Sequence, residues 1–336
     1  MKNFFWLIGL LIALLFSNSV KAQQYSVYQN FAIHPSGSYV AVWRDFTGIC
    51  NDDPIDPIVD DIKLFSYPEL EFLSSIDIEN VNPCVGELLE WSRDGRYLVV
   101  SEGIGSAYVW DSHEKRVISH SYPFGMDQRY GDAFKPDGTL IANTSWGAGV
   151  VLWDPFTGED VKRLFEREVM VMATWSPDGK YLLTSRSEDK MRKCLVLETE
   201  NFTQVASFSC DSWSSLWSGD GTFIITIGKG VLRVWNAQTF ELKHEWFYEM
   251  NISEWALMPD DQSVVLALGD EGLEIWDIET GQKVFAYNPD YPIYTFDVSA
   301  QDSTILYWDA TIENMPHLAT LSRSLEPLEL TATPAK

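Results

Sequence analysis

A run of carboxylates is the part of this sequence best suited to chemistry. Asp52, Asp53, Asp56, Asp60 and Asp61 place five acidic side chains within eleven residues. Hard oxygen ligands of this kind bind Ca²⁺, although their spacing does not match the EF-hand loop and two intervening prolines limit how many can converge. A solvated acidic loop is the simpler interpretation. A docking surface that attracts a basic segment is a further alternative.

Few other residues are spaced for catalysis. The five histidines share no H-x-H or H-E-x-x-H spacing, and the chain has no G-x-S-x-G nucleophile motif. The four cysteines have none of the C-x-x-C spacing that is typical of zinc and thioredoxin-like sites. We therefore expect no cofactor and no enzyme activity, although spacing alone cannot identify carboxylates that converge in space.

The first 22 residues are expected to be an export signal. Lys2 precedes an apolar run from Phe4 to Phe16, and Val20 and Ala22 place small residues at −3 and −1 of a cleavage site. The run is shorter than the roughly 20 residues that a membrane-spanning helix requires. We expect a mature chain that starts at Gln23, lacks a membrane span, and resides in the periplasm or outside the cell.

The charge of the chain narrows the choice of partner. It has 24 Lys and Arg against 49 Asp and Glu, a formal net charge of −25. Such a chain repels the phosphates of nucleic acid, so we expect no nucleic-acid binding. Its 46% hydrophobic content is sufficient for a packed core.

A repeat of about 41 residues organises the chain after the signal. Each copy has an apolar residue, a tight turn and a second apolar run, a pattern that predicts a β-hairpin. The clearest turns are centred on Gly95, Gly138, Gly179 and Gly221, and weaker copies are centred on Gly37, Asp261 and Asp302. A second column follows 14 or 15 residues after the turn, as Trp110-Asp111, Trp153-Asp154, Trp235-Asn236 and Trp276-Asp277.

This pattern resembles that of the WD-repeat β-propeller family, whose repeats have a similar period and a Trp-Asp pair closing the third strand. The resemblance implies an all-β fold, a seven-bladed β-propeller of four-stranded antiparallel blades over residues 23–331. It leaves residues 1–22 as the signal and 332–336 as a tail. No repeat carries the Gly-His pair of the family, so the family's buried His-to-Asp hydrogen bonds are not expected.

The resemblance also implies a binding face. In such propellers the loops that enter the first strand and those that link the second and third strands share one face. Aromatic and charged residues there are our candidates for partner binding. Besides the five aspartates, they are Phe46, Arg129, Tyr130, Trp146, Arg186, Trp213, Tyr294 and Trp308.

The propeller arrangement also makes disulfides plausible. It places Cys50 and Cys84 in neighbouring loops, and we expect them to be bonded. Cys194 and Cys210 flank the outer hairpin of the fourth blade and are a second candidate pair, offset by about three positions in register.

Two functions remain open at this point. One is a monomeric, non-enzymatic scaffold that binds a protein or peptide with a basic segment. The alternative is a cell-envelope enzyme, or a propeller that binds a small ligand or calcium in its central channel.

Overall fold

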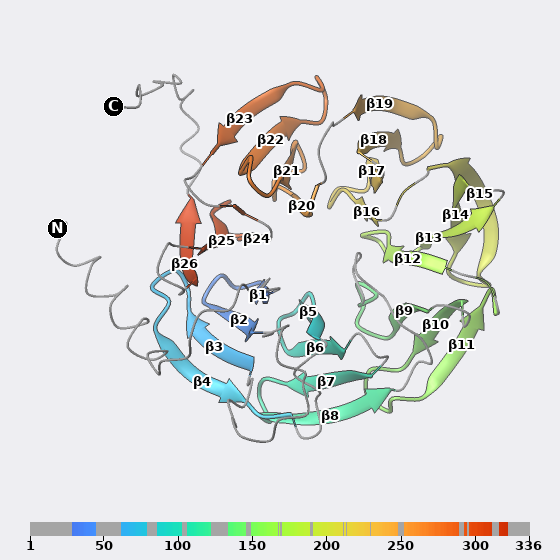
Figure 1. Ribbon diagram of the computed structural model, residues 1–336. Coiled ribbons are helices and arrows are strands. Elements are labelled where there is room, and N and C mark those ends of the chain that lie inside the picture. Colours follow the sequence, from blue (N-terminus) through green and yellow to red (C-terminus); the bar gives the residue numbers. More distant parts are fainter. Residues whose placement is uncertain are drawn as a thin grey trace, which may run out of the picture.

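A computed structural model of the chain describes residues 29–44, 62–78, 86–102, 106–121, 134–145, 149–166, 168, 170–188, 191–210, 212, 214–228, 230–247, 252–288, 292–293, 296–310 and 316–321. Within them, seven antiparallel sheets stand side by side around a ring (Figure 1). The residues that the structure describes include no helix long and apolar enough to cross a membrane.

The first three sheets cover the first half of the ring. Blade one contains β1 (Gln29–Ile33), β2 (Tyr39–Arg44), β3 (Ile62–Ser66) and β4 (Phe72–Ile76). Blade two contains β5 (Gly86–Trp91), β6 (Tyr97–Glu102), β7 (Ala107–Asp111) and β8 (Arg116–Ser121). Blade three contains β9 (Ile141–Ser145), β10 (Gly149–Trp153) and β11 (Asp160–Leu164).

Four further sheets complete the ring. Blade four contains β12 (Met170–Trp175), β13 (Tyr181–Glu188), β14 (Met191–Glu198) and β15 (Thr203–Ser209). Blade five contains β16 (Ser214–Trp217), β17 (Phe223–Gly228), β18 (Val231–Asn236) and β19 (Leu242–Phe247). Blade six contains β20 (Glu254–Leu257), β21 (Ser263–Ala267), β22 (Leu273–Asp277) and β23 (Lys283–Tyr287). The last, which we call the closing sheet, contains β24 (Phe296–Val298), β25 (Ile305–Ala310) and β26 (Pro316–Leu321).

The expectation of seven four-stranded blades is wrong. The described residues form six blades of four antiparallel strands, counting the isolated bridge between Phe134 and Ile141 as the inner strand of blade three. The closing sheet has three strands. The repeat pattern counts turns, whereas each strand also needs a paired neighbour, and the residues after Leu321 lie outside the described part of the chain.

The apolar residue before each hairpin turn is the first column of the repeat, and together with the second column it forms the core. Tryptophans of the two columns pack between blades, where Trp153 is 0% exposed and Trp175 is 1% exposed. The other fully or nearly buried members are Trp91, Trp110, Trp217 and Trp235, while Trp276 is partly buried. Phe65 and Leu197 stand at the Trp position of blades one and four, opposite Val40 and Leu182. Burial of large apolar side chains is the main stabilising contribution in such a core.

The aspartates of six hairpin turns have a structural role. Each carboxylate accepts a hydrogen bond from the backbone N–H two residues further on, which stabilises the turn. The carboxylates are those of Asp94, Asp137, Asp178, Asp220, Asp260 and Asp302. Gly95 has φ +75°, and a Cβ there would stand 2.1 Å from His34 Nε2, so this turn requires glycine.

The ring is closed by contacts between residues far apart in sequence. The closing sheet lies between blade six and blade one (Figure 1). Asp297 Oδ2 accepts a hydrogen bond of 2.7 Å from the backbone N–H of Ile33 in β1. Gln301 Nε2 donates to the backbone oxygen of Pro35 at 2.8 Å. Both contacts join the two ends of the described chain.

Candidate functional site

The strand order gives the ring two distinct faces. The turns from first to second strand and from third to fourth strand meet at one face, which we call the turn face. The connections from second to third strand, and from one blade to the next, belong to the opposite face, which we call the loop face. This follows from the antiparallel pairing of consecutive strands in each sheet.

Most of the predicted partner-binding residues lie outside the described residues. These are Phe46, Asp52, Asp53, Asp56, Asp60, Asp61, Arg129, Tyr130, Trp146, Trp213 and Tyr294, together with Cys50 and Cys84. Their binding role, the Cys50–Cys84 disulfide and the calcium alternative therefore stay predictions.

Two of the predicted partner-binding residues are described. Arg186 is partly buried near the loop-face end of β13, and its Nη1 atom lies 3.4 Å from Glu168 Oε2. Trp308 lies within β25, paired with Leu318, in the second strand of the closing sheet rather than in a loop. The structure does not bring these two residues into one described site.

The second predicted disulfide is confirmed. Cys194 and Cys210 are bonded, with their Cα atoms 5.6 Å apart. Cys194 pairs with Phe208 across β14 and β15, and Cys210 continues two residues further along the chain. The bond therefore ties the outer hairpin of blade four to the segment that leads into blade five.

Acidic residues on the inner strands connect neighbouring blades. Glu90 in β5 accepts a hydrogen bond of 3.1 Å from the backbone N–H of Phe134 in blade three. Asp297 in β24 makes the equivalent contact to Ile33 in blade one. Both acids stand one residue before the first apolar column, so an acidic residue within an apolar inner strand is the sequence signal for this link. Neither residue is among the candidates predicted from the sequence.

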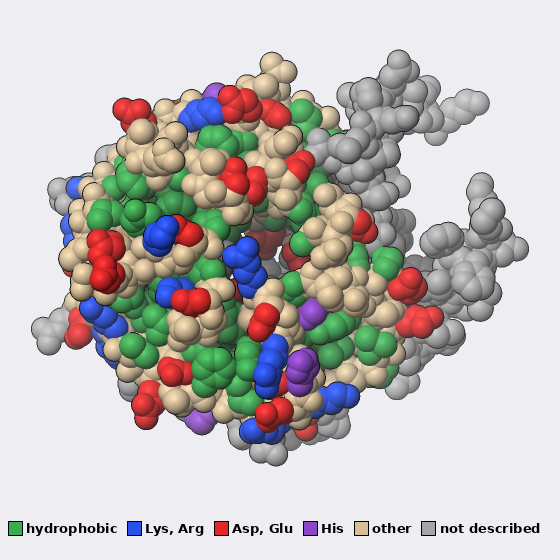
Figure 2. All heavy atoms as spheres, turned by 180° about the vertical axis from the view of Figure 1, so that it is seen from behind, with side chains coloured by type: hydrophobic (Ala, Val, Ile, Leu, Met, Phe, Trp, Pro, Cys, Tyr) green, Lys and Arg blue, Asp and Glu red, His purple; other side chains and the backbone are tan. Residues whose placement is uncertain are grey.

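Glu254 in β20 has a longer hydrogen bond than Glu90 and Asp297. Its Oε1 atom is 3.4 Å from the backbone nitrogen of Trp255, and both Glu254 and Asp297 are partly exposed. Loss of hydration raises the pKa of Glu254 to about 8, and the charge of Asp297 adds to the rise. Loss of hydration also raises the pKa of Asp297 to about 6, against the effect of its two backbone hydrogen bonds. Figure 2 shows acidic side chains deep in the central hollow of the ring.

These inner-strand acids do not form a recognisable metal centre. Among the residues that the structure describes, no group of three or more His, Cys, Asp or Glu side chains is arranged to hold a metal ion. Glu90 and Asp297 have a structural role, because each satisfies a backbone N–H of the next blade.

Blade two carries an arginine site on the turn face that is filled by the chain itself. Arg96 donates to Asp111 Oδ2 from Nε at 3.0 Å and from Nη2 at 2.8 Å, and the Asp111 side chain is 2% exposed. The Arg96 guanidinium carbon also lies 5.1 Å from the centre of the Tyr97 ring. Burial raises the pKa of Asp111, but Arg96 and the N–H groups of Glu114 and His113 hold it below its ordinary value.

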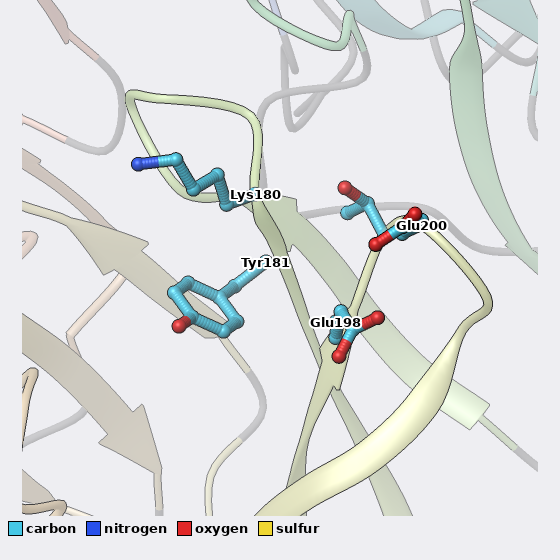
Figure 3. A pocket seen from close by; sticks show the side chains of 5 residues that line it. Lys180, Tyr181, Glu198 and Glu200 are labelled. Atoms are coloured by element: carbon cyan, nitrogen blue, oxygen red, sulfur yellow. The ribbon is translucent and has the colours of Figure 1, made fainter.

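Blade four has the same three positions but a different arrangement. Lys180, Tyr181 and Glu198 stand where blade two has Arg96, Tyr97 and Asp111, since Tyr181 pairs with Glu198 as Tyr97 pairs with Asp111. Lys180 Nζ instead contacts Asp178 Oδ2 at 2.9 Å. A hollow of about 160 Å³ is lined by Lys180, Tyr181, Glu198, Thr199 and Glu200. Figure 3 shows the Lys180 side chain directed away from both glutamates.

Within the described part of the chain, the two glutamates of the hollow therefore have no cation bound to them, because the neighbouring Lys180 pairs with Asp178. Among the described residues, no Lys or Arg forms an ion pair with Glu198 or Glu200. Glu198 Oε1 instead accepts a hydrogen bond of 3.5 Å from Asn201 Nδ2. This hollow was not predicted from the sequence, because its signal appears only when two blades are compared position by position.

Solved structures support the ring architecture. The crystal structure of the β-propeller domain of Cps50 (Swd1) from Myceliophteria thermophila superposes with a TM-score of 0.71, and covers 92% of this chain and 100% of that domain. The chain folds as a β-propeller. At 13% sequence identity, the similarity to that structure shows a shared fold and does not indicate a shared function.

Curated relatives are distant and partial. The propeller is 22% identical over 141 residues to the serine-threonine kinase receptor-associated protein of Gallus gallus, and 19% identical over 142 residues to that of Homo sapiens. It is 20% identical over 237 residues to Protein FIZZY-RELATED 3 of Arabidopsis thaliana. The aligned regions span 40% to 49% of the length of these relatives. Together they support the similarity to WD-repeat propellers, and no protein-family model matches the chain.

Proposed function

We propose that this chain is a non-enzymatic propeller scaffold, exported to the periplasm or beyond the cell, which binds a protein or peptide through its loop face. The observation that carries the proposal is the closed ring, in which backbone groups of one blade are bonded to side chains of the next. A frame of this kind holds its loops in fixed relative positions while their sequences vary. WD-repeat propellers typically serve as interaction scaffolds.

A basic segment in the partner would complement the charge of the chain. The net charge of −25 attracts a cationic partner from a distance, and five of the acids are concentrated between Asp52 and Asp61. Aromatic residues that the sequence predicts to lie on the loop face, such as Trp213, would supply the desolvated contacts that slow dissociation. Charge would therefore govern the association rate, and aromatic contacts the dissociation rate.

The test separates these two contributions. After a partner has been identified by capture from an envelope extract, its binding kinetics are measured with a variant in which Asp52, Asp53, Asp56, Asp60 and Asp61 are replaced by asparagine. We expect slower association that depends less on salt. Trp213→Ala is expected to speed dissociation, by roughly 30-fold for a loss of about 2 kcal/mol.

A control variant replaces four exposed acids of the turn face by glutamine, and its association rate should change much less. The acids are Glu69, Glu71, Glu159 and Glu241. Unchanged kinetics in both loop-face variants, with the fold intact by circular dichroism, would contradict the proposal and favour the channel as the functional site.

A further inference from the structure

Blade two shows what the hollow of blade four lacks. In blade two a guanidinium lies against a tyrosine ring and donates two hydrogen bonds to one carboxylate. In blade four the tyrosine and the carboxylate are retained as Tyr181 and Glu198, while the cation at this position has turned to Asp178. The space beside Glu198 is open to solvent and borders the second acid, Glu200.

We propose that the hollow of blade four binds an arginine side chain of a protein partner. The guanidinium would take the place that Arg96 occupies in blade two, with its face against Tyr181 and its N–H groups toward Glu198. Planar guanidinium groups suit this arrangement, because they stack on aromatic rings and donate two parallel hydrogen bonds to a carboxylate. Lysine offers a point charge without the planar fork, so arginine is the preferred occupant.

The pairing of residue types is specific to blades two and four. At the position after the turn, a basic residue followed by tyrosine occurs as Arg96-Tyr97 and Lys180-Tyr181. Blade five has Thr222 and Phe223 there, and its third strand ends at Asn236, which has no charge. The hollow is therefore not a general property of the repeat.

The inference deepens the proposed function, since it names a side chain that a protein partner would offer, but it concerns the turn face. Its test uses hexa-arginine and hexa-lysine peptides carrying a fluorescent label, with binding measured by anisotropy at 0.15 M salt. We expect the wild-type protein to bind hexa-arginine more tightly than hexa-lysine. The double variant Glu198→Gln, Glu200→Gln should lose about 3- to 10-fold in affinity for hexa-arginine.

Two further variants make the result specific. Glu69→Gln with Glu71→Gln removes the same charge from the equivalent turn of blade one, and should leave hexa-arginine binding within about 2-fold of wild type. Lys180→Arg offers the hollow a guanidinium from its own chain, as in blade two. This substitution keeps the net charge, yet it should weaken peptide binding because the site is then filled.

Three outcomes would overturn the inference: equal binding of the two peptides, equal losses in the blade four and blade one double variants, or no effect of Lys180→Arg. The failures of the two proposals are distinguishable. Loss of partner capture after the loop-face substitutions bears on the proposed function, whereas the peptide experiment reports on the hollow without any natural partner.

Discussion

Blade four and the closing sheet are held in the ring by opposite means. Blade four has two strands of eight residues, β13 and β14, and a disulfide that joins residues 16 positions apart. The closing sheet begins with a strand of three residues, β24, and is fixed to blade one by hydrogen bonds from residues more than 260 positions away. One depends on local, covalent connection, and the other on long-range polar contacts.

Removal of the disulfide is expected to have the largest effect. Replacing Cys194 and Cys210 by alanine should lower the free energy of unfolding by about 3 kcal/mol, because the unfolded chain regains the entropy of a loop of this length. Urea unfolding followed by tryptophan fluorescence measures the change. In reductant, wild type and the variant should unfold at the same urea concentration, because neither then carries this bond. A midpoint that reductant leaves unchanged would show that the bond contributes little.

Loss of the hydrogen bond between Ile33 and Asp297 is expected to lower the free energy of unfolding somewhat less. Asp297→Ala leaves the backbone N–H of Ile33 without its acceptor, and should lower the free energy of unfolding by about 1–3 kcal/mol. Asp297→Asn retains an acceptor oxygen and should be at least as stable as wild type at pH 7.5, because it avoids a poorly hydrated charge. Equal losses in both variants would mean that the charge, and not the hydrogen bond, holds the sheet.

A smaller effect should appear as a dependence of stability on pH. Since the pKa of Glu254 is raised to about 8 and that of Asp297 to about 6, the folded protein binds more protons than the unfolded chain between about pH 4 and pH 8. Stability contributed by the protonated groups is therefore lost as the pH rises through this range. Glu254→Gln should unfold at a higher urea concentration than wild type at pH 8 and show a shallower decline from pH 6.

The matched control is Glu241→Gln, which removes an exposed carboxylate of blade five. Its stability should decline with pH in parallel with wild type. If the Glu254→Gln curve also runs parallel to wild type, the raised pKa is refuted.

The same contrast explains what could be predicted from the sequence. Contacts within a blade follow from the repeat, so the hairpin turns, the Trp-Asp column and the candidate bond between Cys194 and Cys210 were predicted from neighbouring residues. Contacts between blades are not encoded in one repeat. The hydrogen bond from Ile33 to Asp297 joins residues 264 positions apart. An acid within an apolar inner strand marks Asp297 locally, but no local pattern indicates its partner.

Two other features escaped prediction for related reasons. The three strands of the closing sheet could not be counted from the turn at Asp302, because a turn does not show whether a further strand pairs outside it. The hollow of blade four is open because the Lys180 side chain is directed to Asp178 and not to Glu198. Both acids are compatible with the sequence, so geometry decides between them.

The bond between Asp297 and Ile33 also has a consequence for how the molecule is made. During synthesis strand β1 emerges long before β24, so its inner edge lacks this contact until almost all of the described chain has been made. Bringing such distant residues together carries a loop-closure entropy cost that delays the final step, and contacts of long sequence separation are associated with slow folding. In that interval an unpaired strand edge is exposed to other chains. The closing sheet, which is synthesised last, thus sets the period during which the nascent protein is most vulnerable to misassembly.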